Sequence, residues 1–176
     1  RRGLENPVNK DDLVEQIQNE SLAIMQRKGF NEQEVREFWT LLGDDYFLRE
    51  QPQHIAWQTQ AILEHGDSDQ PLVMIRKTSY RAFEGATEIF IYMPDLPSLF
   101  AAAASALDQL NLNIQDARIM VADNNQALNT YTVLAEDSMP LPDDEAFLEQ
   151  IRNHLVEELD DPDDFPAIIQ RRIPRQ

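Results

Sequence analysis

The short stretch "MPDLPSLF" (Met93–Phe100) carries the residues best suited to binding a ligand. It leaves a strand-like run, turns at Asp95 and Pro97, and enters the alanine-rich segment "AAAASALDQL". The first N–H groups of a helix lack internal partners and lie at its positive end, so they attract anions. A free amino acid could therefore place its carboxylate on these N–H groups and its ammonium on Asp95. A purely structural alternative uses the same residues, because Asp95 can cap the helix and Pro97 can begin it.

The other polar residues form no catalytic or metal-binding pattern. The four aspartates of "LDDPDDF" (Leu159–Phe165) lack the D-x-D-x-D-G order and the closing glutamate of a calcium loop. Asp44 and Asp45 could form an acid–base pair, but they follow a helix end at Gly43 and suit a cap for the next turn better. No glycine-rich phosphate loop occurs. The three histidines lie far apart and have no metal-ligand spacing (His54, His65 and His154). We therefore predict that this chain has no catalytic residues, no metal site and no cofactor of its own.

The charge balance narrows the range of partners. The 176 residues include 32 acidic and 15 basic side chains, which gives a net charge of −17. Such a field repels phosphate backbones and anionic lipids, so we predict neither a nucleic-acid partner nor a membrane partner. The chain has no cysteine, which excludes disulfides and thiolate zinc sites. No apolar run approaches the ~18 residues of a bilayer-spanning helix. A cytoplasmic location is the simplest expectation.

The elements that position the Met93–Phe100 turn follow from hydrophobic periodicity. Residues 1–66 repeat apolar side chains at helical spacing and predict three helices, two of them capped by Asn9 and Asn31. The segment "DDYFLREQP" is a short turn or a further helix. Residues 67–71 form a polar linker, and beyond it the period changes from about 3.6 to 2.

Residues 72–176 alternate strands and helices. Two strands, Leu72–Thr78 and Thr87–Met93, are joined by a loose connection "SYRAFEGA", and the alanine-rich helix follows with Phe100 on its apolar face. Two more strands, "IQDARIMVA" and "ALNTYTVLA", precede a last long helix. This order predicts an α+β fold: a helical segment, then a ferredoxin-like βαββαβ domain whose antiparallel sheet carries both helices on one face. Small alanine side chains would let the first of these helices lie close to the sheet.

The segment "IYMPDLPSLFAAAASALDQLNLNIQDARI" resembles an ACT domain, a small-molecule-sensing module whose loop typically reads D-x-P-G-L before its first helix. Ser98 stands where that loop usually has glycine, and Asn111 stands where a second glycine is common. The resemblance implies a ligand loop and, across a paired domain, two residues at the start of the following strand. The implied amino-acid site consists of Asp95, Leu96, Pro97, Ser98, Leu99, Phe100, Asn113 and Ile114.

The flanking segments "RRGLENP", "LGDDYFL", "IAWQTQAIL" and "RRIPRQ" are similar to the C-terminal part of the bifunctional protein-PII uridylyltransferase/uridylyl-removing enzymes. The resemblance implies a fragment, consistent with a start at Arg1 rather than methionine, that follows a hydrolase domain and holds the first of two ACT domains. In this family, glutamine status decides whether UMP is attached to PII or removed. Implied partners are L-glutamine, PII through the parent enzyme, and a second ACT domain or a second copy of this chain. Magnesium is implied for the parent enzyme alone.

Two functional interpretations remain open from the sequence. In the first, the module binds glutamine and regulates the parent enzyme. In the second, it is a structural ACT module that pairs with another ACT domain and binds no ligand in this loop. The segment "RRIPRQ" ends the chain where the last ACT strand should begin or be under way. Either the lead-in strand Leu72–Thr78 or another molecule would then occupy the sheet edge beside Thr87–Met93.

Overall fold

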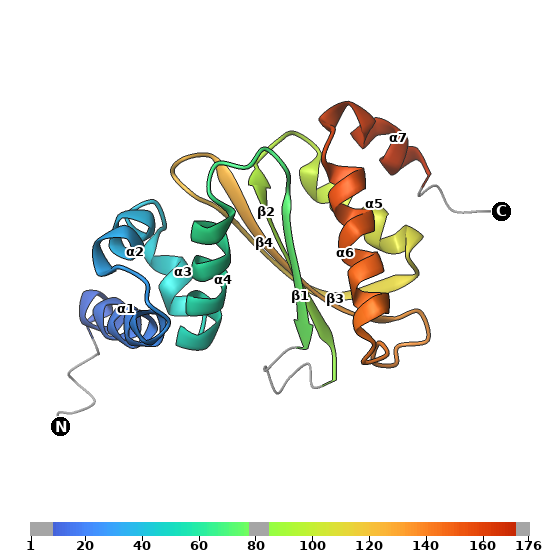
Figure 1. The fold of residues 1–176 in the computed structure, drawn as a ribbon. Coiled ribbons are helices and arrows are strands. Elements are labelled where there is room, and N and C mark those ends of the chain that lie inside the picture. Colours follow the sequence, from blue (N-terminus) through green and yellow to red (C-terminus); the bar gives the residue numbers. More distant parts are fainter. Residues whose placement is uncertain (1–8, 78–84, 172–176) are drawn as a thin grey trace, which may run out of the picture. The chain divides into compact units, whose positions relative to one another are not determined.

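Two units make up the chain, and the computed structural model describes them over residues 9–77 and 85–171 (Figure 1). The first unit runs to Gly66 and includes Ala122–Asn124, and the second contains the remainder from Asp67 onwards. The predicted connection "SYRAFEGA" falls mostly on residues 78–84, outside the described residues. Across the described helices, none has both the length and the apolar composition needed to cross a membrane.

The first unit contains the helices α1 (Lys10–Arg27), α2 (Glu32–Trp39), α3 (Asp44–Arg49) and α4 (Pro52–His65). The two predicted N-caps are confirmed, because a side-chain oxygen of each asparagine accepts a backbone N–H. Asn9 accepts from Asp11 at 2.8 Å and Asn31 accepts from Glu34 at 3.2 Å. The segment that sequence left as a turn or helix forms α3.

Aromatic packing and two buried hydrogen bonds hold the first unit together. The Phe47 ring meets Trp39 edge-on, with ring centroids 5.6 Å apart, and meets Tyr46 edge-on at 5.3 Å. The indole Nε1 of Trp39 donates to Thr59 Oγ1 at 3.0 Å, and the Tyr46 hydroxyl donates to Gln58 Oε1 at 2.7 Å. These bonds satisfy polar atoms that burial would otherwise leave without partners.

The second unit is built on a four-stranded sheet. Its strands are β1 (Leu72–Lys77), β2 (Thr87–Pro94), β3 (Leu112–Val121) and β4 (Gln126–Ala135), in the order β1-β2-β4-β3. All neighbouring strands are antiparallel, so β2 and β3 run parallel to each other with β4 between them. Helix α5 (Leu99–Gln109) connects β2 to β3 across the sheet. This split βαβ arrangement confirms the predicted ferredoxin-like fold.

Strand β1 occupies the sheet edge beside β2, paired in register from Leu72 opposite Tyr92 to Lys77 opposite Thr87. In the ferredoxin-like plan this position belongs to the last strand of the domain. The lead-in strand therefore fills the edge, which is one of the two arrangements that the sequence left open. After α6 (Glu145–Leu159), the chain forms the short turn of helix η3 (Pro162–Asp164) and then α7 (Phe165–Gln170).

The segment "RRIPRQ", where the sequence predicted the last ACT strand, falls on residues 172–176 except for its first arginine and so lies almost wholly outside the described residues; the residues before it form the helix α7. Pro166 suits a first helical turn because its missing N–H needs no partner there. Phe165 and Ile168 are both buried on the inner side of this helix.

The core of the second unit lies between one face of the sheet and the helices α5 and α6, which Figure 1 shows on the same side of it. Ala102, Ala103 and Ala106 are fully buried, as are Ile89 and Ile91 of β2. The small alanine side chains allow α5 to lie close to the strands, as predicted. Helix α6 adds three buried side chains to the same core, Ile151, Leu155 and Leu159.

Candidate functional site

The candidate ligand loop links the end of β2 to the start of α5. The backbone N–H of Asp95 donates to the carbonyl of Asn125 at 2.9 Å, which ties the loop to the neighbouring β3–β4 turn. The N–H of Leu99 donates to the carbonyl of Leu96 at 3.1 Å and closes a tight turn before the helix. Asp95 is half-buried, whereas Pro97 is exposed. The loop is therefore a fixed turn with an acidic side chain beside a helix N-terminus.

Helix α5 begins later than the capping alternative required. Its N-cap is Ser98, whose side chain makes no capping hydrogen bond, and Asp95 and Pro97 both precede it. Ser98 has φ 68° and ψ 11°, the left-handed conformation. An N-cap side chain normally accepts an N–H from the first turn only when its backbone is extended. The left-handed backbone of Ser98 thus leaves the N-terminus of α5 without a side-chain cap from this residue.

Both positions where the sequence departs from the ACT pattern have a left-handed backbone. Asn111, just beyond the end of α5, has φ 61°, and its N–H donates to the Asp108 carbonyl at 2.9 Å. Glycine adopts this conformation without a steric penalty, whereas a residue with a Cβ loses about 1–2 kcal/mol. Asparagine tolerates it better than serine because its short side chain bonds locally. The expected glycine geometry is therefore retained at Ser98 and Asn111 although neither residue is glycine.

The other two predicted site residues, Asn113 and Ile114, lie at the opposite end of the sheet from the loop. Ile114 pairs with Val133, whereas the loop continues from Pro94, which pairs with Gln126 at the other end of β4. At about 3.3 Å per residue, the two groups lie roughly 20 Å apart along the strands. A single copy of the domain does not bring these eight residues together.

Beneath the first turn of α5 lies a buried polar pair that the sequence analysis did not single out. Tyr131 and Asn129 point from β4 toward the helices, and Asn129 Nδ2 donates to the Tyr131 hydroxyl at 3.5 Å. Within the described part of the chain, the buried Oδ1 of Asn129 has no hydrogen-bond partner. The Phe100 ring lies 6.0 Å from the Tyr131 ring. The alternation of "ALNTYTVLA" already placed Asn129 on the apolar face of its strand, and this was the available signal.

Phe100 was predicted on the buried face of its helix, but its side chain is 49% exposed. Ile119 and Val121 of β3 are 41% and 44% exposed. Ile119 pairs with Asn129 and Val121 with Ala127, so both point to the side of the sheet that carries α5. Since β3 is an edge strand, these large apolar side chains lie along a border of the domain that has no neighbouring strand among the described residues.

Burial raises the pKa of the Tyr131 hydroxyl to about 12, and the hydrogen bond from Asn129 opposes part of the shift. Because the folded state disfavours the ionised hydroxyl, the contribution of Tyr131 to the free energy of unfolding is fully present below pH 10. This contribution is lost as the pH rises from about 10 to about 12. Over that range the free energy of unfolding of the unchanged protein should fall by about 2–3 kcal/mol through Tyr131, and this fall should be absent in Tyr131→Phe. Urea unfolding of both proteins between pH 9 and 12 measures this. Parallel stability curves would contradict the expectation.

The histidine and acidic side chains of the described residues were the candidates for a metal site. Over residues 9–77 and 85–171, no three histidine or acidic side chains converge closely enough to hold a metal ion. His54 lies buried in α4 of the first unit, and His154 lies in α6, where its Nε2 is 3.6 Å from Glu158. The loop itself presents one carboxylate, that of Asp95, beside the N-terminus of α5.

Comparison with known proteins identifies relatives of the whole chain. Residues 9–61 match a family model described as the fifth domain of the uridylyltransferase GlnD. Over 176 residues, the chain is 47% identical to the bifunctional uridylyltransferase/uridylyl-removing enzyme of Ectopseudomonas mendocina and 48% identical to that of Azotobacter vinelandii. Each match covers 100% of this chain and 20% of the relative, so the chain spans a fifth of their length. No solved structure gave a significant match.

Proposed function

Over its whole length this chain is a homologue of a segment of the bifunctional uridylyltransferase/uridylyl-removing enzymes, and we propose that it is their regulatory ACT module. In this role it contributes to glutamine sensing, which switches the parent enzyme between attaching UMP to the PII protein and removing it. The module regulates and does not catalyse. Magnesium, proposed for the parent enzyme, would serve its catalytic domains.

The loop between β2 and α5 is the observation that supports ligand binding. Its acidic residue, Asp95, is half-buried and held by a backbone bond at 2.9 Å, and Ser98 keeps a backbone conformation that usually requires glycine. Because its backbone is left-handed, Ser98 does not cap the N-terminus of α5 with its side chain. The carboxylate of glutamine would bind at the N-terminus of α5, where the positive end of the helix dipole favours anions. Its ammonium would pair with Asp95.

Pairing of two domains would complete the site. Asn113 and Ile114 lie at the far end of the β3 edge, so only a second sheet running antiparallel alongside could bring such residues to the loop. The exposed Phe100, Ile119 and Val121 give this border an apolar surface suited to association. The partner would be the second ACT domain of the parent enzyme or a second copy of this chain.

Calorimetric titration with L-glutamine tests the proposal. We expect saturable binding, and we expect Asp95→Ala to weaken it about 10- to 100-fold because a charge-assisted hydrogen bond is lost. Asp108→Ala is the matched control, since Asp108 is an exposed aspartate at the other end of α5. No heat from this chain, together with an unchanged glutamine response in a parent enzyme carrying Asp95→Ala, would contradict the proposal.

A structural ACT module without a ligand is the second candidate, and the exposed Ser98 side chain favours it. That side chain stands where backbone would approach a ligand, so it can narrow the site. Ser98→Gly separates the two candidates because glycine keeps the observed φ of 68° without strain. If Ser98→Gly binds glutamine and the unchanged chain does not, the loop has lost its ligand role and the structural candidate holds.

A further inference from the structure

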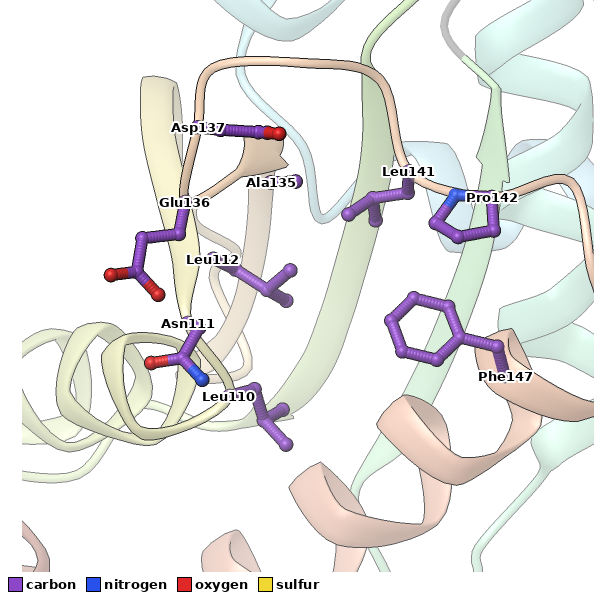
Figure 2. A pocket seen from close by; sticks show the side chains of 9 residues that line it. All are labelled: Leu110, Asn111, Leu112, Ala135, Glu136, Asp137, Leu141, Pro142 and Phe147. Atoms are coloured by element: carbon purple, nitrogen blue, oxygen red, sulfur yellow. The ribbon is translucent and has the colours of Figure 1, made fainter.

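A cavity of about 580 Å³ opens at the C-terminal end of α5, at the opposite end of that helix from the ligand loop. Figure 2 shows Leu110 and Leu112 on one side of it, facing Leu141 and Phe147 on the other, with Asp137 above them. Its volume falls in the range of about 300–1,000 Å³ that is common for small-molecule sites. The cavity has a mainly apolar lining with a few polar groups at its rim, which is also typical of such sites.

The rim of the cavity is held in place by specific contacts. Asp137 Oδ1 accepts the Met139 N–H at 3.0 Å, and the Ala135 N–H donates to the Met139 carbonyl at 2.8 Å, so the turn after β4 is closed. On the other side, Lys77 Nζ donates to the Leu141 carbonyl at 3.0 Å. Leu141 and Leu112 are themselves buried. The cavity is therefore a formed feature of the domain and does not depend on a loose loop.

Three sources make the electrostatic potential of this cavity negative. Glu136 and Asp137 contribute carboxylates, and within the described residues neither forms an ion pair. The C-terminal end of α5 adds the negative pole of its dipole, and its last turn contains no basic residue to offset it. None of the nine lining residues is basic, and the Lys77 ammonium that bonds the Leu141 carbonyl is one positive charge against these two carboxylates. The net charge of −17 strengthens the preference for cations.

We propose that this cavity binds a small organic cation, an ammonium group carried on an apolar body about the size of an aromatic ring. The apolar body lies between Leu110 and Leu112 on one side and Leu141 and Phe147 on the other. The ammonium points to the rim, where Asp137 and, farther out, Glu136 attract it. Apolar carboxylates of the same size bind more weakly, because the carboxylates at the rim repel them. This site is separate from the glutamine loop, so the proposal does not rest on the proposed function.

The probe for this site is 2-phenylethylamine, which is a cation at pH 7. Titrated into the ¹⁵N-labelled 176-residue chain, it should shift the amide signals of residues 110–112, 135–137 and 141–147 in a saturable way. We expect a dissociation constant on the order of 1–10 mM, typical of a ligand this small. The matched probes are 3-phenylpropanoate, an anion of similar size, and the neutral 2-phenylethanol, and both should bind at least about threefold more weakly.

Charge-neutral variants complete the test. The double variant Glu136→Gln with Asp137→Asn should weaken the amine about fivefold or more. The substitution Asp137→Asn retains a side-chain oxygen that can accept the Met139 N–H, so the turn is preserved. Asp143→Asn removes a charge from the same connection outside the cavity and should leave affinity unchanged. Equal binding of the amine and the carboxylate, full affinity in the double variant, or shifts that do not saturate or are scattered over the surface would each overturn the proposal.

Discussion

Leu107→Ala is expected to lower the free energy of unfolding of the sheet unit by about 2–5 kcal/mol. Leu107 is fully buried in the core between α5 and the sheet. The neighbouring core positions on its helix are alanines, among them Ala103 and Ala106, so this leucine supplies much of the apolar volume of α5. Backbone on both sides is fixed by the sheet and by the turns at the ends of the helix. The site can therefore collapse only in part, and a cavity would remain.

Hydrogen exchange of the β2 and β4 amides is the measurement, because both tryptophans, Trp39 and Trp57, lie in the other unit. Tryptophan fluorescence would mostly report the helices of the first unit. Met139→Ala is the control, since this side chain is 58% exposed and its removal should change stability by less than about 0.5 kcal/mol. Equal effects of the two substitutions would show that α5 is loosely packed.

Much of the second unit could be predicted from the sequence because its strands alternate clearly. In β2, Ile89 and Ile91 point to the core and Phe90 to the other face, as the period of two requires. The turn into α5 was also evident from Asp95 and Pro97. The left-handed backbone of Ser98 was suggested only by comparison with a pattern that has glycine there, because serine by itself favours no such conformation.

Features that depend on long-range pairing were harder to predict. The position of β1 beside β2 is set by backbone pairing across the connection between them, and the local sequence of β1 is compatible with other edges as well. The exposure of Phe100 depends on where α5 starts, since one residue rotates a helical side chain by about 100°. The cavity beside Phe147 is formed by the residues that follow α5, the start of β3, the end of β4 with the connection after it, and α6, which periodicity alone cannot bring together.

Nothing in the sequence pointed to Glu88 of β2 as a buried carboxylate, yet its side chain is fully buried. It alternates with Ile89 and so points to the face of the sheet away from α5 and α6. Glu88 Oε1 lies 3.4 Å from Arg76 Nε of β1, and its Oε2 lies 3.3 Å from Arg118 Nη2 of β3. Arg118 Nη1 lies 3.6 Å from Asp116 Oδ2. Opposite charges thus alternate across the sheet, and the single carboxylate of Glu88 connects the two edge strands.

Glu88→Leu is expected to lower the free energy of unfolding of the sheet unit by about 3 kcal/mol, near the lower end for a broken buried ion pair. The Arg118 side chain is only 13% exposed, so the substitution leaves a nearly buried guanidinium with Asp116 as its remaining acidic partner among these contacts. Arg76 is more exposed and can turn its charge to water at little cost. Hydrogen exchange of the β2 and β4 amides again measures the change.

The double variant Glu88→Leu with Arg118→Met distinguishes a lost charge pair from lost packing. Removing both charges leaves no buried ion without its counter-ion, so the double variant should be about 1–2 kcal/mol more stable than Glu88→Leu alone. Asp116→Asn is the control: its carboxylate is 35% exposed, so neutralising it should cost less than about 1 kcal/mol. If the double variant is the least stable of the three, packing at these positions outweighs charge. In that case Glu88 does not join the edge strands through its ion pairs.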